Sequence, residues 1–172
     1  MAPAVPLVVG LMSGTSLDGV DAVLVDFSNS LPRIVSTYWL PFPTALRENA
    51  LHLQAPQYDE IHAPALFSNE LARCYAIAVA EVLALGHAEA KQVAAIGCHG
   101  QTVRHQPTAG YSVQLNNPAL LAELSGISVV ADFRSRDIAA GGQGAPLVPA
   151  FHSAVFRDPS QHRVILNIGG IA

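Results

Sequence analysis

Three strand-like segments precede the first helix-like segment of this sequence, and that order limits the folds it can adopt. An apolar run over residues 6–11 and a Val-rich alternating run that ends at Phe27 flank a short polar turn. A third alternating run follows at residues 33–40. Strands joined by short turns pair as an antiparallel meander, whereas a doubly wound fold would place a helix after its first strand. We therefore predict a sheet that starts with an antiparallel three-strand meander.

Helix and strand patterns alternate over the rest of the chain. The expected helices are residues 44–54, capped by Thr44, residues 64–86, residues 118–125, started by Asn117-Pro118 and closed by Gly126, and residues 147–156. The expected strands lie within residues 91–99, 111–115, 128–131 and 163–168. The predicted fold class is α/β, with a mixed sheet and helices on both faces.

The turn between the first two strands has the residue types of an anion site. Gly14 and Gly19 can adopt positive φ and let the backbone approach a ligand, so successive N–H groups can point at one anion. The hydroxyls of Thr15 and Ser16 add donors, and a phosphate fits this arrangement. A plain glycine-containing hairpin is the alternative. A Walker A loop is excluded because no Lys follows the second glycine and no helix pattern begins there.

Two carboxylates in the same turn bear on what accompanies the anion. Asp18 and Asp21 would repel a phosphate unless one of them holds a divalent cation or its water shell. Mg²⁺ is usually bound in that way beside nucleotide phosphates. The turn is therefore consistent with a nucleotide and its Mg²⁺.

A second polar group follows the buried strand predicted within residues 91–99. His99, Gln101 and Thr102 come at its carboxyl end, where ligands gather in sheets with helical crossovers. We expect these three side chains in a binding site. The alternative for His99 is a satisfied, half-buried histidine with a structural role.

Residues 132–147 combine two arginines, two aspartates and three glycines in what reads as one loop after a strand. Such a loop adds little to a core, and loops of this kind are usually functional. Arg134 and Arg136 could offer a planar fork to a carboxylate. The alternative is an Arg–Asp network with Asp132 and Asp137 that only stiffens the loop.

Composition and charge narrow the class of protein. Hydrophobic residues make up 51% of the chain and charged residues 13%, which indicates a globular domain. A formal charge of −4 without a basic run argues against nucleic acid as a partner. No segment is long and apolar enough for a membrane span, and no signal-peptide pattern opens the chain, so we expect a cytoplasmic protein. The isolated Cys74 and Cys98 suit buried thiols in a reducing compartment, and the histidines lack the spacing of a zinc site.

Four segments of the sequence form longer motifs. They are G-L-M-S-G-T-S-L-D-G-V-D at residues 10–21, H-G-Q-T at 99–102, D-F-R-x-x-D-I-A-A-G-G-Q-G-A-P-L at 132–147 and N-I-G-G-I-A at 167–172. Together they resemble the anhydro-N-acetylmuramic acid kinases, a family of the actin-like (ribonuclease H-like) ATPase superfamily. The resemblance extends over nearly the whole chain and covers the family's N-terminal portion.

The resemblance implies roles for particular residues. It implies an ATP-binding hairpin made of Gly14, Thr15, Ser16, Leu17, Asp18, Gly19, Val20 and Asp21. It implies sugar contacts from His99, Gln101, Thr102, Arg134 and Asp137, and a second phosphate turn that begins at Gly169 and Gly170. The cofactors are then ATP and Mg²⁺, and one of the arginines would meet the carboxylate on the lactyl ether of muramic acid.

The resemblance also implies a reaction in peptidoglycan recycling. Water attacks the anomeric carbon of 1,6-anhydro-N-acetylmuramic acid, the anhydro bond opens, and the freed oxygen on C6 takes the γ-phosphoryl group of ATP. The family's general-base aspartate is expected after Ala172, so no catalytic residue is assigned in this chain. We expect residues 1–172 to form the N-terminal lobe of the kinase, without its second lobe and inactive alone.

Two other functions are left open by the sequence. One is a sugar kinase of another branch of the superfamily, which would share the phosphate hairpin but not the H-G-Q-T and 132–147 motifs together. The other is a non-catalytic module that binds a nucleotide. The expected partner is a small amino sugar rather than nucleic acid or a membrane, and a homodimer is compatible with the sequence.

Overall fold

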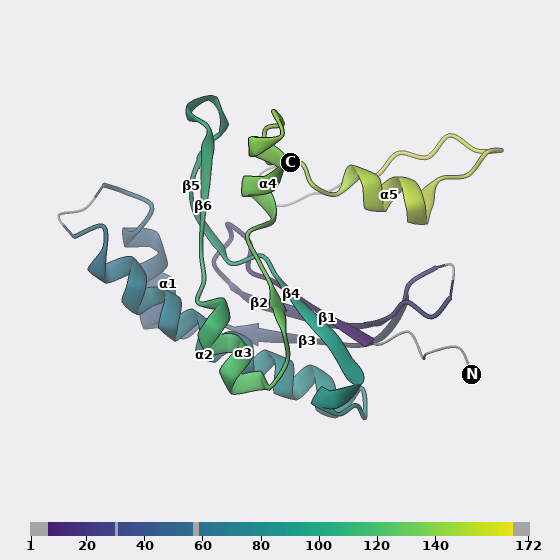
Figure 1. Ribbon diagram of the computed structural model, residues 1–172, viewed down its shortest axis with the longest axis horizontal. Helices are drawn as coiled ribbons and strands as arrows, with labels where there is room; N and C mark the ends of the chain where they lie inside the picture. The colour runs from purple at the N-terminus through teal and green to yellow at the C-terminus, as the bar shows by residue number, and fades with distance from the viewer. Residues whose placement is uncertain (1–6, 30, 57–58, 167–172) are drawn as a thin grey trace.

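A computed structural model describes residues 7–29, 31–56 and 59–166, and a five-stranded sheet lies at its centre (Figure 1). The strands of this part of the chain are β1 (Leu7–Met12), β2 (Gly19–Asp26), β3 (Arg33–Pro41), β4 (Val93–Cys98), β5 (Gln101–Gln106), β6 (Tyr111–Leu115) and β7 (Val129–Val130). The helices are α1 (Thr44–His52), α2 (His62–Leu85), α3 (Pro118–Ser125), α4 (Phe133–Ala139) and α5 (Pro149–Phe156), with 3₁₀ turns at Ala90–Gln92 and Pro107–Ala109. No helix in these ranges combines the length and apolarity needed to cross a bilayer.

The sheet has the strand order β3-β2-β1-β4-β7 and mixes both pairing types. Strand β2 is antiparallel to β1 and β3, which confirms the predicted meander. Strand β1 is parallel to β4, and β4 is parallel to β7. The pairing of β1 with β2 ends at Met12 opposite Asp21, so the residues between them form the turn at the end of the sheet.

Helix α2 covers one face of the sheet, against β2 and β3. Its Phe67, Leu71 and Tyr75 are almost fully buried. Burial of each such side chain contributes roughly 1.5–3 kcal/mol to folding. On the opposite face lie α4 and α5 (Figure 1), which gives the predicted arrangement of helices on both faces.

The N-terminal ends of α1 and α2 differ from the prediction. Thr44 is the first helical residue of α1 rather than its cap, since Pro43 occupies the cap position and no side chain caps the helix. Helix α2 begins at His62, two residues before the predicted start, because Oδ1 of Asp59 accepts the backbone N–H of His62 at 2.8 Å. That bond satisfies an amide at the helix end, so Pro64 falls inside the first turn.

Helix α3 has the predicted bounds, and strand β7 lies within its predicted range. The side chain of Asn117 accepts the N–H of Leu120 at 3.0 Å, and Gly126 closes the helix with φ +68°. A left-handed residue at this position suits glycine because other residues meet a steric penalty. Strand β7 is shorter than the four residues predicted for it.

Two segments for which no helix or strand was predicted are regular structure. Residues 101–106 form β5, which pairs with β6 in a hairpin beside α4 (Figure 1). Residues 133–139, predicted as part of a loop, form α4, and Asp132 at its start has φ +57°. Ser135 donates to Oδ1 of Asp132 at 2.6 Å, which holds this first turn together.

The buried strand predicted at residues 163–168 is wrong for the part that the structure describes. Val164 is 90% exposed and Leu166 74%, and residues 163–166 pair with no strand in the described ranges. Arg163 instead donates to Oδ2 of Asp158 and to the carbonyl of Phe156, so this segment is tied to the end of α5. The predicted second phosphate turn at Gly169 and Gly170 lies outside the described residues.

Candidate functional site

The polar turn joins the carboxyl end of β1 to the start of β2. Ser13 at its base is 1% exposed and Leu17 in its middle is also 1% exposed, so both side chains anchor the turn to the core. Leu17 N donates to the carbonyl of Gly14 at 3.3 Å. Thr15, Ser16 and Asp18 are left exposed at the tip. The turn therefore presents a short polar edge to solvent.

The glycines of the turn serve a purpose different from the predicted one. Positive φ falls on Leu17, at +55°, and not on Gly14 or Gly19. A Cβ on Gly19 would clash with the backbone of Leu40 and lie 2.8 Å from Nε1 of Trp39. Gly19 thus permits close packing against β3. A glycine is required at this position, but for its missing side chain and not for a positive φ.

The tip of the turn keeps donors free. Within the described ranges, no hydrogen bond engages the backbone N–H of Thr15 or of Ser16. Both residues line an open hollow of about 480 Å³ whose other wall includes Thr102 from β5. Two of the predicted groups, the turn and the H-G-Q-T run, therefore meet at this hollow.

Asp18 is an ionised, exposed carboxylate at the edge of the turn. Ser16 donates its hydroxyl to Oδ1 of Asp18 at 2.6 Å. That bond, together with the amides of Asp18 and Gly19, holds the pKa of Asp18 below its usual value, although burial acts in the opposite direction. The group carries a full negative charge at neutral pH.

The remaining predicted nucleotide residues lie elsewhere. Val20 is fully buried, so, like Leu17, it can meet a ligand only through its backbone. Asp21 is exposed, but it lines the larger cavity on the sheet face opposite α2. The structure thus separates the two carboxylates of the turn.

His99 and Arg134 form a pair at the carboxyl end of β4. Nδ1 of His99 lies 2.7 Å from the carbonyl oxygen of Gly100, and Nε of Arg134 donates to Nε2 of His99 at 3.0 Å. These contacts define a neutral imidazole with its proton on Nδ1. Burial lowers the pKa of His99, the charge of Arg134 lowers it further, and the bond to Gly100 opposes both.

Residues of α4 also shape the loop that follows it. Arg134 donates to the carbonyl of Gly144, and Oδ2 of Asp137 accepts the N–H of Gly144 at 2.7 Å. No ion pair in the described ranges joins either arginine to Asp132 or Asp137. The Arg–Asp network that was the alternative to a ligand site is therefore not formed, although Arg134 and Asp137 do stiffen the loop.

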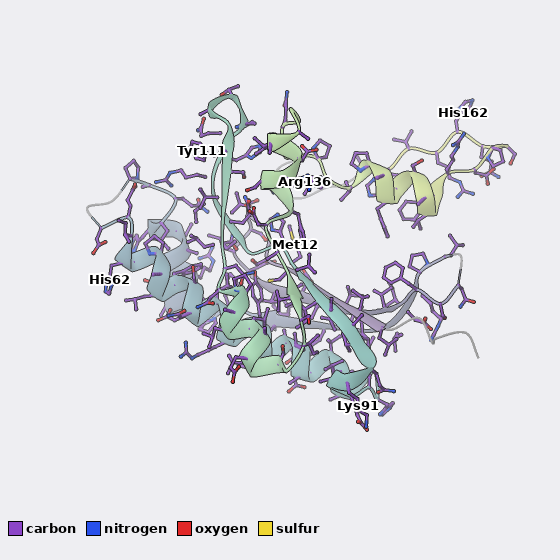
Figure 2. The ribbon with its side chains drawn as sticks, in the orientation of Figure 1. Met12, His62, Lys91, Tyr111, Arg136 and His162 are labelled. Atoms are coloured by element: carbon purple, nitrogen blue, oxygen red, sulfur yellow. The ribbon has the colours of Figure 1, made fainter. Side chains whose placement is uncertain are left out.

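A cavity of about 710 Å³ lies between the sheet and the segment from α4 to α5. Most of the residues that line it are apolar, and those with polar side-chain atoms are Asp21, Thr37, Tyr38, Trp39, His99 and Arg134. Figure 2 labels Met12 at the end of β1 and Arg136 on α4, which stands over that end of the sheet. Arg136 is exposed and does not line the cavity, so Arg134 is the better placed arginine.

Comparison with known proteins places the chain in a family. The sequence model of the family described as "Anhydro-N-acetylmuramic acid kinase" matches residues 6–172. This chain belongs to the anhydro-N-acetylmuramic acid kinase family. Membership confirms the resemblance seen in the motifs and the actin-like ATPase fold class.

Curated relatives of that name are similar over most of this chain. The protein of Nitrosospira multiformis is 58% identical over 166 residues, which is 95% of this chain and 45% of that protein. Those of Albidiferax ferrireducens and Thiobacillus denitrificans are 58% and 59% identical, with 96% and 95% of this chain and 44% of each relative covered. The chain thus spans less than half the length of these anhydro-N-acetylmuramic acid kinases.

Two residues of this family member were not singled out from the sequence as site residues. Ser13 and Tyr75 are buried and hydrogen-bonded to each other directly beneath the turn, at 2.7 Å. Ser13 continues the alternation of the inward-facing Val9 and Leu11, which is the signal that would have placed it. Tyr75 is hidden in the apolar pattern of α2, although a buried phenol needs a partner.

Gln101 lies deeper than its predicted role requires. It is 1% exposed, and its Nε2 donates to the carbonyl of Gly14 at 3.2 Å. Thr102, by contrast, faces the hollow and accepts Nε2 of Gln114 at 3.2 Å. Within the H-G-Q-T run, His99 and Thr102 reach open space while Gln101 faces the turn from inside.

The neutral state of His99 predicts a pH dependence. Because its pKa in the folded protein lies below the ordinary 6.5, the unfolded chain binds the proton first as pH falls. Stability is therefore retained above about pH 6.5 and lost as pH falls from there toward the folded pKa. The melting temperature of His99→Gln should therefore change less with pH across this window than the melting temperature of wild type. The exposed His162→Gln is the matched control, and equal pH slopes for both variants would contradict the neutral assignment.

Proposed function

We propose that the complete gene product carrying this chain is an ATP-dependent kinase of 1,6-anhydro-N-acetylmuramic acid. Water adds to the anomeric carbon, the bond from that carbon to the anhydro oxygen breaks, and the freed O6 accepts the γ-phosphoryl group as ADP leaves. The products are N-acetylmuramic acid 6-phosphate and ADP, a step of peptidoglycan recycling in the cytoplasm. The observation that carries the proposal is the exposed turn with free amides in a chain of this family.

The turn is the phosphate side of the proposed site. The free N–H groups of Thr15 and Ser16 are donors of the kind that bind phosphate oxygens. Asp18 fits the Mg²⁺ that accompanies ATP, because an ionised, exposed carboxylate is a hard oxygen ligand for that ion or its waters. Bound Mg²⁺ would offset the negative charge of the phosphates. Gly14, whose missing Cβ would meet only Ser16, leaves the backbone room to approach them.

The pair His99 and Arg134 is the sugar side. Nε and one terminal nitrogen of Arg134 are used by His99 and Gly144, and the remaining N–H groups suit a carboxylate such as that of the lactyl ether. Asp137 contributes by holding Gly144 in place. No residue of this chain is assigned as the base that activates water, and residues 1–172 are proposed as the N-terminal lobe.

An activity assay tests the proposal. The complete gene product is incubated with ATP, Mg²⁺ and 1,6-anhydro-N-acetylmuramic acid, and the sugar phosphate is identified by mass. Plain hexoses serve as competing substrates, because equal phosphorylation of them would favour another branch of the superfamily. Binding of ATP without turnover would favour a nucleotide-binding module, and absence of ATP binding would overturn the proposal.

Replacement of Asp18 separates its charge from the fold. Asp18→Asn should weaken binding of ATP in Mg²⁺ about tenfold or more, while ATP without Mg²⁺ should bind no worse, because a repelling charge is lost. Stability should change by less than about 0.5 kcal/mol since the side chain is exposed. Titration calorimetry with and without EDTA measures this.

Asp158→Asn is the matched control for that variant. Oδ1 of Asp158 also accepts a neighbouring hydroxyl, that of Ser160, at 2.6 Å, but the pair lies in the segment after α5. Its affinity for ATP should equal that of wild type in both buffers. A Mg²⁺ dependence unchanged by Asp18→Asn would remove this carboxylate from the metal role.

A further inference from the structure

A buried polar chain runs from α2 to the base of the turn. Tyr75 OH lies 2.7 Å from Oγ of Ser13, and Oγ of Ser13 donates to the carbonyl of Gly100 at 3.4 Å. Both side chains are almost fully buried, at 0% and 1% exposed. The chain therefore joins three elements that are far apart in the sequence.

The direction of these bonds follows from their donors. Since Ser13 gives its proton to the Gly100 carbonyl, it receives one from the phenol of Tyr75. Burial raises the pKa of Tyr75, so the phenol keeps its proton at any physiological pH. The Gly100 carbonyl also accepts Nδ1–H of His99. One carbonyl thus connects the base of the turn to the His99–Arg134 pair.

Gln101 adds a second support from the same side. Its Nε2 donates to the carbonyl of Gly14 at 3.2 Å and weakly to that of Thr102 at 3.5 Å. The Gly14 carbonyl is the one that accepts Leu17 N and closes the turn. The turn is therefore held at two consecutive residues, Ser13 by Tyr75 and Gly14 by Gln101.

We propose that Tyr75 and Gln101 are positioning residues that fix the turn for phosphate binding without touching a ligand. This inference rests on the proposed function insofar as the turn binds ATP. It reassigns Gln101 from a sugar contact to a support of the turn. It also explains why α2 places a tyrosine and not a phenylalanine against the sheet. The phenol donates a hydrogen bond to the buried Oγ of Ser13, and a phenyl ring could not.

Hydrogen exchange in the complete gene product tests the inference without relying on nucleotide. Tyr75→Phe keeps the ring in the core and removes only the hydroxyl. The amides of residues 14–18 should exchange about tenfold faster, because a lost buried hydrogen bond shifts a local opening equilibrium by about that factor. Tyr111→Phe, an exposed tyrosine at the start of β6, is the control and should leave these amides unchanged (Figure 2).

Binding of ATP with Mg²⁺ is the second measurement. Tyr75→Phe and Gln101→Met should each weaken it about three- to tenfold, with the KM for the sugar less affected, because the support acts on the phosphate side. Ser13→Ala combined with Tyr75→Phe should cost little more than either alone, as expected for one chain of bonds. A merely structural role would lower the melting temperature and leave exchange and affinity as in Tyr111→Phe.

The outcomes separate this inference from the proposed function. If wild type fails to bind ATP, the proposed function fails, while the exchange of residues 14–18 still decides whether Tyr75 and Gln101 hold the turn. If wild type is an active kinase and neither variant alters exchange or ATP affinity, the positioning role is overturned. Faster exchange with weaker ATP binding supports both.

Discussion

Gly19→Ala is expected to destabilise the protein by about 2–3 kcal/mol, because a side chain there overpacks a site with no room to yield. The added Cβ would clash with the backbone oxygen of Leu40, and backbone in a paired strand cannot rotate away as a side chain can. Strand β3 would have to move off β2 at the point where the turn ends. Phosphate binding should fall with it, since Gly19 is the first residue of β2.

Gly14→Ala provides the matched comparison within the same turn. Its Cβ would lie 3.4 Å from Oγ of Ser16, an ordinary contact with a flexible side chain. Its stability should stay within about 0.5 kcal/mol of wild type. Denaturant unfolding of the two variants gives the difference directly. Equal losses would show that both glycines act through conformational freedom, which is the explanation that the sequence alone suggested.

That suggestion shows where reading the sequence succeeds and fails. The alternation of apolar residues in β1, β2 and β3 is local, so the meander could be predicted. The reason for Gly19 is not local, because it depends on the backbone of β3 about twenty residues later. The left-handed residue of the turn is Leu17, which no propensity would select.

Helix α4 and strand β5 were not predicted for a different reason. Helix α4 is a short helix of seven residues whose start depends on the unusual backbone of Asp132, and glycines nearby suggested a loop. Strand β5 takes its regularity from β6, so its partner decides its structure more than its own pattern. The backbone conformation of Asp132 and the pairing with β6 decide these structures, and neither appears in the periodicity of the segment itself.

The candidate site also contains both groups of residues that are neighbours in the sequence and contacts between residues that are far apart in it. That Thr15, Ser16 and Asp18 lie together in one exposed turn could be predicted because they are nearly consecutive in the sequence. The contact of His99 with Arg134 could not, because the two are 35 positions apart and meet only through β4 and α4. The role of Tyr75 could not be predicted either, because an aromatic residue on the apolar face of an amphipathic helix is normally only part of the core.

If the complete gene product is the proposed kinase, Arg134→Ala in it is expected to raise the KM for the sugar acid at least about tenfold, because charge-assisted hydrogen bonds are worth about 1.5–3 kcal/mol. The affinity for ATP should stay close to that of wild type. The guanidinium of Arg134 donates to Nε2 of His99 and to the Gly144 carbonyl, so its removal frees the loop after α4. Its remaining N–H groups would also no longer be present to bind the ligand. Arg134→Lys should restore little, since one ammonium cannot reproduce a planar fork with several fixed N–H groups.

Arg136→Ala is the control for Arg134→Ala, because Arg136 lies on the same helix but is exposed. Steady-state kinetics with the sugar and with ATP varied in turn give the comparison. A carboxylate-free analogue of the sugar adds a sharper test: wild type and Arg134→Ala should use it equally poorly if this arginine meets the carboxylate. If Arg134→Ala instead raises the KM for the sugar and for ATP equally, the side chain serves only to support the loop, and the carboxylate must be bound by another group. The pairing with His99 would then be a structural contact that shapes the end of β4, which is the role that burial and two satisfied ring nitrogens would already explain.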